Sequence, residues 1–95
     1  MAKKRSHYDI LLAVLMVCSS GARKTRIMYS ANLSYDLTNK YLDLAQRNGL
    51  VVRKDNLYFL SEKGRGFMEK LRRFKEIYGQ VKEIEQDLKR SIIRM

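Results

Sequence analysis

The sequence predicts a small, mainly α-helical domain that contains one β-hairpin and continues into a long C-terminal helix. Its length of 95 residues leaves room for one domain and one further element. The chain contains no Pro and only 5 Gly, a composition that favours long helices. Helical periodicity gives way to a strand-like pattern only between Gly49 and Ser61.

The first predicted helix runs from Ser6 to about Cys18. Ser6 is a suitable N-cap, and Asp9 lies where the helix dipole favours an acid. Because the helix is apolar nearly all round, we expect it to be buried on several sides. With the preceding Lys3-Lys4-Arg5 this stretch also looks like a secretory signal, but Asp9 abuts an apolar run of only nine residues. That run is too short to span a bilayer, so a core helix without membrane association is the preferred interpretation.

A helix-turn-helix is predicted next. A short helix covers about residues 23–30, a turn follows at 31–33, and Ser34 caps a third helix that ends near Asn48. Its expected buried face holds Leu37, Tyr41 and Leu44, with a second row at Leu42 and Ala45. Gly49 is a natural helix stop.

Two β-rich runs, 50–54 and 57–60, surround the turn-forming pair Asp55-Asn56 and predict a hairpin. Ser61 then opens a helix without a strong breaker before Met95, which at 1.5 Å per residue makes a rod of about 50 Å. This order of elements is that of a winged-helix DNA-binding domain, expected over residues 1–60, with a dimerisation helix over 61–95.

In a winged helix, the helix after the turn enters the major groove, and basic residues around it contact phosphates. The candidate DNA-binding residues are Lys3, Lys4, Arg5, Arg23, Lys24, Arg26, Ser34, Tyr35, Thr38, Asn39, Lys40, Arg53, Lys54 and Asn56. On the third helix Asn39 can bond adenine and Thr38 any base, but Asp36 and Asp43 are poor neighbours for phosphate.

The charge of the chain supports a polyanionic partner. Lys and Arg number 20 against 10 Asp and Glu, a formal net charge of +10. Residues 1–30 carry net +5, residues 31–60 net +1 and residues 61–95 net +4. The positive charge therefore surrounds the third helix rather than lying on it, which favours gripping of the backbone of double-stranded DNA with weak sequence preference.

The last helix carries an apolar stripe at heptad spacing. The candidate dimer-interface residues are Phe67, Leu71, Phe74, Ile77, Tyr78, Val81, Ile84, Leu88 and Ile92. A projecting rod cannot bury such a stripe on its own domain, so a homodimer is expected, with a helix folded back as core as the alternative. An antiparallel pair is favoured because it keeps Ile77 and Ile84 away from the lysines on the other flank and does not set Glu85 against its own copy.

Catalysis, cofactors and metals are not expected. A single cysteine, Cys18, and a single histidine, His7, provide neither a disulfide nor a zinc site. Cys18 lies in the most apolar run, where an inert buried thiol in a reduced, cytoplasmic compartment is the simplest interpretation. No Gly-rich phosphate loop or small-molecule site is evident.

Several segments resemble one protein family. They are residues 2–5 with Tyr8-Asp9-Ile10, residues 24–33 (KTRIMYSANL), residues 40–43 (KYLD), residues 48–51 (NGLV) and residues 60–64 (LSEKG). The whole chain resembles the small archaeal winged-helix chromatin proteins of the "ten a" DNA-binding family of Sulfolobus. The resemblance implies a nucleoid-associated protein, dimeric through an antiparallel coiled coil, with two winged helices that bridge or coat DNA. No base motif of that family can be carried over residue by residue.

Two alternative functions remain open from the sequence. The chain is a transcription regulator if Tyr35, Thr38 and Asn39 read a specific operator, or a coiled-coil protein adaptor if its charge serves only solubility. Duplex RNA is a further possible ligand, because phosphate contacts are common to both nucleic acids.

Overall fold

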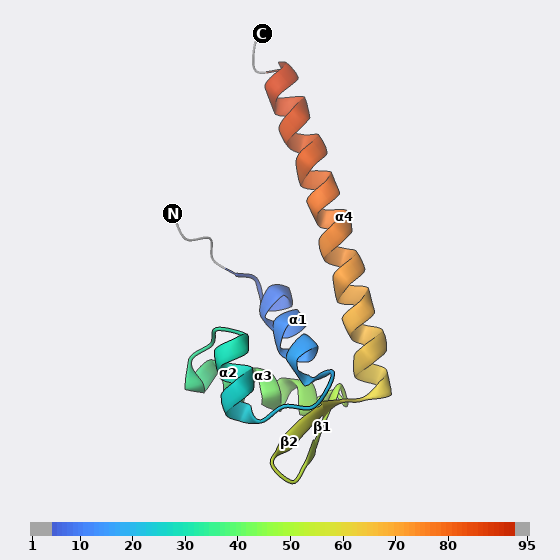
Figure 1. Cartoon of the computed structure of the whole chain (residues 1–95). Coiled ribbons are helices and arrows are strands. Elements are labelled where there is room, and N and C mark those ends of the chain that lie inside the picture. Colours follow the sequence, from blue (N-terminus) through green and yellow to red (C-terminus); the bar gives the residue numbers. More distant parts are fainter. Residues whose placement is uncertain (1–4, 93–95) are drawn as a thin grey trace.

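The computed structural model describes residues 5–92 and shows a three-helix head with a β-hairpin, from which one long helix projects (Figure 1). The elements are α1 (His7–Cys18), α2 (Lys24–Ser30), α3 (Tyr35–Arg47), β1 (Val51–Lys54), β2 (Leu57–Leu60) and α4 (Glu62–Ile92). The predicted order is confirmed. The molecule is elongated, with principal extents of 61 × 29 × 19 Å, because α4 extends well beyond the head.

Helix α1 is the centre of the core. Its N-terminus is closed by a capping box in which the Ser6 side chain accepts a hydrogen bond from the Asp9 amide and Asp9 accepts one from the Ser6 amide. Leu11, Leu12, Val14, Leu15 and Cys18 are buried against the surrounding elements. The helix is therefore covered on several sides, as its apolar composition predicts.

Helices α2 and α3 form the helix-turn-helix. Between them Asn32 adopts a left-handed conformation with φ of 55°, and Ser34 caps α3 by accepting a hydrogen bond from the Leu37 amide. The buried face of α3 consists of Thr38, Tyr41, Leu42 and Ala45. The expectation that Leu37 and Leu44 share this face is wrong, because the face is turned by about one residue toward Thr38 and leaves both leucines exposed.

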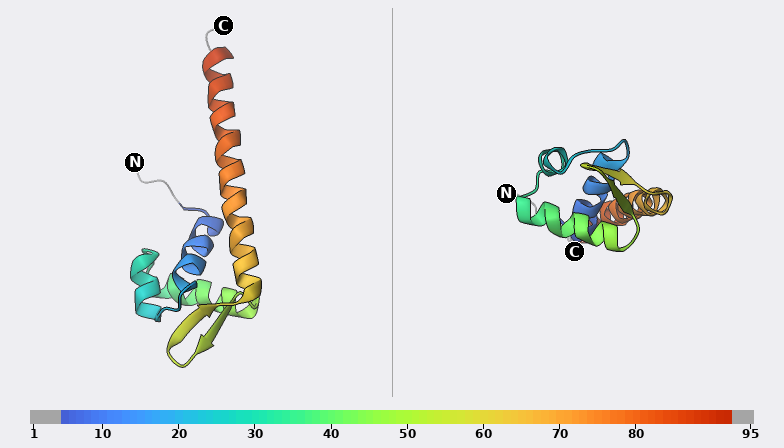
Figure 2. Two further views of the ribbon diagram at one scale, coloured as in Figure 1. Left: turned by 45° about the vertical axis from the view of Figure 1, so that its right-hand side comes forward. Right: turned by 90° about the horizontal axis from the view of Figure 1, so that it is seen from below.

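The hairpin is antiparallel, with Val52 opposite Phe59 and Arg53 opposite Tyr58 across the strands. Asp55 lies in the turn with φ of 56°. On the other side of β2, Ala22 and Tyr58 exchange two backbone hydrogen bonds of 2.8 and 3.0 Å. This bridge attaches the β1–β2 hairpin, which we call the wing, to the loop between α1 and α2, so the wing lies close to the start of α2 (Figure 2).

A tight junction joins the wing to α4. The Ser61 amide donates to the Leu50 carbonyl and its hydroxyl donates to the Gly49 carbonyl, while the Gly64 amide donates to the Ser61 hydroxyl. Gly64 lies so close to the Leu50 carbonyl that a Cβ there would be only 2.0 Å from the oxygen. The start of α4 is therefore locked onto the turn after α3.

The first turns of α4 belong to the core of the head. Met68 and Leu71 are buried, and Phe67 packs against the same cluster, while α1 lies alongside this part of α4 (Figures 1 and 2). Leu71 is only 5% exposed, which corrects its assignment to a dimer interface, because its own domain already covers it.

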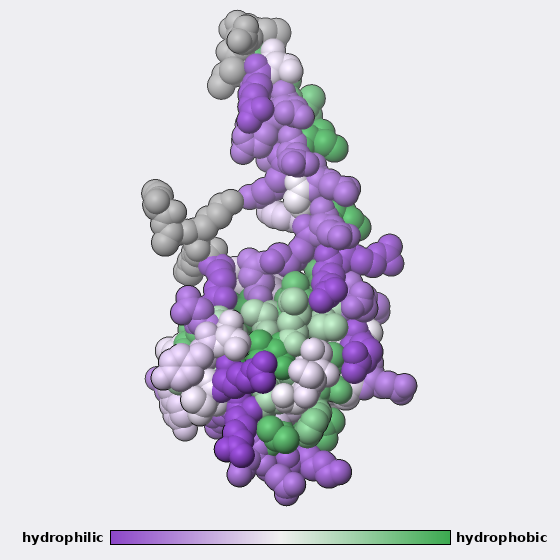
Figure 3. All heavy atoms as spheres, in the orientation of Figure 1, coloured by the Kyte–Doolittle hydropathy of each residue, from purple (hydrophilic) through white to green (hydrophobic). Residues whose placement is uncertain are grey.

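Beyond Leu71 every residue through Ile92 is exposed, although Phe74 and Lys75 still contact the start of α1. Its large apolar residues remain about half accessible, and they are Phe74, Ile77, Tyr78, Val81, Ile84, Leu88 and Ile92. We call these seven residues the apolar stripe. Figure 3 shows apolar side chains along one edge of the projecting helix and hydrophilic ones over most of the face in view. Of the helices within residues 5–92, none has the length and apolarity to cross a membrane.

Candidate nucleic-acid interface

The N-terminal half of α3, with its cap, exposes three of the residues predicted to contact DNA. Ser34 and Lys40 are exposed, and the Tyr35 side chain is 61% exposed. Asn39 is half-buried, with part of its surface accessible. Each of these side chains therefore presents polar atoms to solvent at the end of α3 that follows the turn.

Thr38 does not belong to this surface. It is fully buried, and its hydroxyl donates a 2.8 Å hydrogen bond to the Ser34 carbonyl. We therefore correct its assignment as a base-contacting residue, because the hydroxyl is used inside the helix and the methyl group packs in the core.

Helix α2 contributes a basic and aromatic surface beside α3. Arg23 and Arg26 are exposed, and the Lys24 ammonium lies 5.7 Å from the centre of the Tyr35 ring. Tyr29 was not predicted as a site residue, yet its side chain is 75% exposed. Its position three residues after Arg26 is the signal that could have identified it, because i and i+3 share a helix face.

The wing carries a second group of cations. The Arg53 Nε donates a 3.1 Å hydrogen bond to the Asp55 carbonyl, and its guanidinium lies 5.8 Å from the Tyr58 ring centre. These contacts hold Arg53 along the strand, while Lys54 and Asn56 are exposed at the tip. The wing therefore presents an ordered cation next to two freely accessible polar side chains.

Arg5, the first residue that the structure describes, contacts the helix-turn-helix. An Arg5 Nη2 donates a 2.9 Å hydrogen bond to the Asn32 carbonyl in the turn between α2 and α3. Lys3 and Lys4 lie outside the described residues. Arg5 thus adds a positive charge at the edge of the surface formed by α2 and α3.

Helix α3 itself contributes no net charge. Asp36 and Asp43 balance Lys40 and Arg47. Arg47 forms an ion pair with Asp43 at 2.7 Å, and this carboxylate raises the pKa of Arg47. Apart from Lys40, the exposed cations near α3 are Arg5 and those of α2 and the wing, where they suit phosphate oxygens better than base edges.

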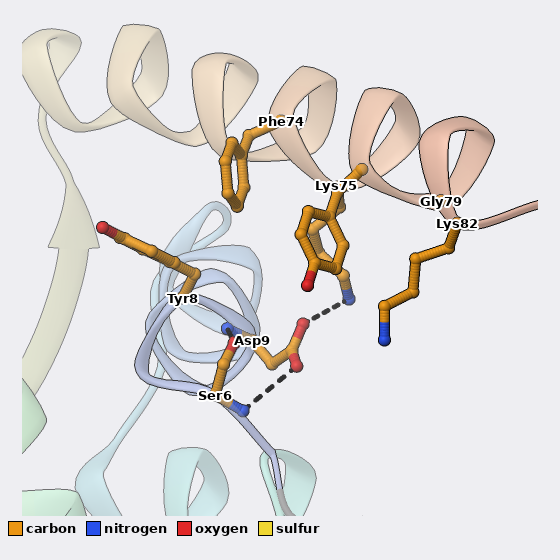
Figure 4. Close-up of a pocket in the computed structure, with 8 residues that line it drawn as sticks. Ser6, Tyr8, Asp9, Phe74, Lys75, Gly79 and Lys82 are labelled. Carbon is orange, nitrogen blue, oxygen red and sulfur yellow. Dashed lines mark hydrogen bonds and ion pairs between the residues drawn. The ribbon is translucent and has the colours of Figure 1, made fainter. Parts of the chain in front are cut away.

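A second surface lies where α1 meets the projecting part of α4 (Figure 4). The Tyr8 ring contacts the Phe74 ring edge-on, with centroids 5.2 Å apart, and Lys75 donates to the Asp9 carboxylate at 2.9 Å. The Lys75 ammonium, together with the Ser6 amide, holds the pKa of Asp9 below its usual value. The open groove here has a volume of about 500 Å³, and its lining includes Phe74 and Tyr78, the first and third residues of the apolar stripe.

Cys18 and His7, the single cysteine and the single histidine of the chain, both make structural contacts. Burial raises the pKa of the Cys18 thiol to about 12, which leaves it protonated at neutral pH. His7 is hydrogen-bonded to the Tyr41 hydroxyl. Within residues 5–92 no three His, Cys, Asp or Glu side chains gather closely enough to hold a metal ion.

The chain is similar in sequence to a known protein family and to one archaeal protein. A model of the winged helix-turn-helix family matches residues 4–79. The uncharacterized protein MJ0287 of Methanocaldococcus jannaschii is 33% identical over 75 residues, which cover 78% of this chain and 77% of that protein.

Two solved structures share the fold at low sequence identity. Sso10a-2, a DNA-binding protein from Sulfolobus solfataricus, superposes with a TM-score of 0.86 at 22% identity, covering 93% of this chain and 97% of its own. A protein of unknown function from Listeria innocua superposes with a TM-score of 0.63 at 20% identity, covering 87% of this chain and 73% of its own. The agreement with Sso10a-2 extends over nearly the whole of both chains, the long last helix included.

Proposed function

We propose that this chain, which belongs to the winged helix-turn-helix family, is a non-enzymatic DNA-binding homodimer that grips duplex DNA largely without regard to sequence. The observation that carries this proposal is the distribution of charge. Arg23, Arg26 and the wing cations are exposed around an α3 of zero net charge. Contacts to phosphates supply affinity without sequence information, whereas base contacts would have to come from α3.

The description of one structural relative supports DNA as the binding partner. Sso10a-2 is described as a DNA-binding protein and shares the fold over 93% of this chain. The net charge of +10 suits the same polyanion. We infer that the ligand of this chain is double-stranded chromosomal DNA.

The apolar stripe supports the homodimer. Seven large apolar side chains are about half exposed along one face of α4, and an isolated helix has nothing to cover them. A second copy of the chain offers an identical stripe. Two heads held at the ends of a paired rod can bridge two duplexes or coat one, which is an architectural role.

The test is a binding isotherm on random duplex DNA at several salt concentrations, with the oligomeric state measured alongside. A dimer that neutralises about eight phosphates gives a slope of log K against log salt near −7. Competition with a ten-fold excess of random duplex separates the alternatives, because specific sites exceed non-specific ones by about 10³ or more. A site that resists this competition would identify a sequence-specific regulator, and no duplex binding at ~50 mM salt would favour an adaptor.

Replacing Arg53 and Lys54 by Ala tests the interface itself. The double variant should bind all sequences more weakly and show a salt slope smaller by about four, because each dimer loses four cations. The matched control is Lys89→Ala with Arg90→Ala, which removes the same charge from the far end of α4. Equal losses in both variants would show that total charge, and not the wing, governs binding.

A further inference from the structure

We propose that the groove between the start of α1 and the projecting part of α4 binds a small planar aromatic compound that carries one carboxylate. The volume of the groove, about 500 Å³, lies in the range of about 300–1,000 Å³ that is typical of small-molecule sites (Figure 4). All of its lining residues belong to one protomer. The inference therefore goes beyond the proposed function and depends on neither DNA binding nor the homodimer.

One wall of the groove is aromatic. The Phe74 ring contacts two tyrosine rings, edge-on to Tyr8 with centroids 5.2 Å apart and stacked with Tyr78 with centroids 5.9 Å apart. Each of these three side chains is about half exposed. Aromatic rings attract other flat rings, and covering them removes apolar surface from water. The wall therefore suits a planar ring better than a polar molecule without one.

One cation of the groove has no counter-ion among the described residues. The Asp9 carboxylate holds the Lys75 ammonium at 2.9 Å, but no carboxylate within residues 5–92 pairs with Lys82. The Lys82 ammonium lies 5.4 Å from the centre of the Tyr78 ring, beside the aromatic wall. Two lysines and one aspartate give the lining a net charge of +1. This charge favours a ligand that carries one negative charge next to its ring.

A glycine keeps the groove open between the two lysines. Lys75, Gly79 and Lys82 are spaced by four and three residues, so they lie on one face of α4. Figure 4 shows both lysine side chains pointing from this face toward the start of α1. Gly is unfavourable inside a helix compared with Ala, and a Cβ at Gly79 would meet nothing within 4 Å. The missing side chain thus leaves room for a flat ring.

A ligand in this groove contacts the head and the rod together. Its ring packs against the aromatic wall, and its carboxylate accepts hydrogen bonds from the Lys82 ammonium. The Ser6 hydroxyl accepts a hydrogen bond from the Asp9 amide and keeps its own proton available as a further donor. Because the lining comes from the start of α1 and from α4, a bound ligand stiffens the junction between them.

Isothermal titration calorimetry of the full chain with cinnamate, a planar aromatic carboxylate, tests the proposal. Cinnamate should bind with a Kd of about 1 mM or lower. Cinnamyl alcohol lacks the charge and octanoate lacks the ring, so each should bind about ten-fold more weakly. No binding of cinnamate at ~10 mM would overturn the proposal, as would equal binding of either analogue.

Gly79→Leu tests the location of the site. The added side chain fills the space between Lys75 and Lys82 without removing any group, so the affinity for cinnamate should fall at least about ten-fold. Gly66→Leu is the matched control, because a Cβ at Gly66 also meets nothing within 4 Å and Gly66 does not line the groove. Both positions are exposed on α4, and Leu is the better helix former, so the head stays folded in both variants. Unchanged affinity in Gly79→Leu, or equal losses in both variants, would place cinnamate elsewhere and refute the site.

Lys82→Met tests the counter-ion. The affinity for cinnamate should fall about ten-fold, whereas that for cinnamyl alcohol should not change. Lys89→Met removes the same charge one heptad further along α4, outside the groove, and should leave both affinities unchanged. A Lys82→Met variant that binds duplex DNA more weakly but cinnamate as before would assign the groove to the DNA backbone and contradict the proposal.

Discussion

Gly64→Ala should destabilise the head, although Ala is the better helix former. Gly64 lies in the first turns of α4, where an added Cβ would be 2.0 Å from the Leu50 carbonyl oxygen and 2.8 Å from both the Leu50 carbonyl carbon and a methyl of Leu60. Two of these atoms are backbone, so relief requires that α4 and the turn before β1 separate. The same carbonyl accepts the Ser61 amide at 2.9 Å, and that bond would be strained by the movement.

Three contributions determine how much Gly64→Ala lowers the free energy of unfolding. Overpacking of this kind costs about 1–3 kcal/mol. Loss of the hydrogen bond to Leu50 adds about 1 kcal/mol. Replacement of Gly by Ala inside a helix stabilises the helix by about 1 kcal/mol, which offsets part of this loss. The free energy of unfolding should therefore fall by about 2 kcal/mol.

Gly66→Ala is the matched control, because a Cβ there meets nothing within 4 Å. It should raise the free energy of unfolding by up to about 1 kcal/mol. Both variants are measured by urea unfolding followed by circular dichroism, at one protein concentration so that association contributes equally. Gly64→Ala as stable as the wild type would refute the close approach of α4 to Leu50.

Further predictions concern the rod, the first helix and the thiol. Val81→Lys with Leu88→Lys should give a monomer by ultracentrifugation with the head still folded, because both side chains are exposed within one protomer; a persistent dimer would contradict the role of the stripe. The pKa of Asp9 is lowered in the folded state, so the stability that its carboxylate contributes is present above the usual carboxyl pKa and is lost as pH falls through the lowered value. Urea unfolding at several acidic pH values should therefore show a weaker loss of stability with falling pH in the Asp9→Asn variant than in the wild type. Cys18 should react with a thiol reagent only upon unfolding, since its pKa is about 12 and it is buried; rapid labelling at pH 8 in the native state would disprove this.

The order of elements was predictable because each boundary has a local signal. Ser6 and Ser34 cap helices, and Gly49 ends one with φ of 71°. The hairpin turn at Asp55-Asn56 and the alternation around it are equally local. No long-range knowledge is needed to place these boundaries.

The face that each helix buries depends on tertiary contacts, and the spacing of apolar residues in the sequence does not reveal these contacts. On α3, Leu37 and Leu44 match a helical period as well as Tyr41 does, but the head buries Thr38 in their place. The heptad pattern likewise continues through Leu71 without marking where the head ends. The bridge between Ala22 and Tyr58 was also missed, because one residue of pairing leaves no pattern in the sequence.

Helix α4 serves as core and as rod without a break between them. Only two residues separate the buried Leu71 from the exposed Phe74, and α4 is continuous from Glu62 to Ile92. Each added residue turns an α-helix by about 100° and lengthens it by 1.5 Å, so in the proposed homodimer a single insertion beyond Leu71 would rotate one head about the rod relative to the other. In that homodimer the helical phase of α4 would set the mutual orientation of the two heads, and with it the angle at which two bound duplexes would cross.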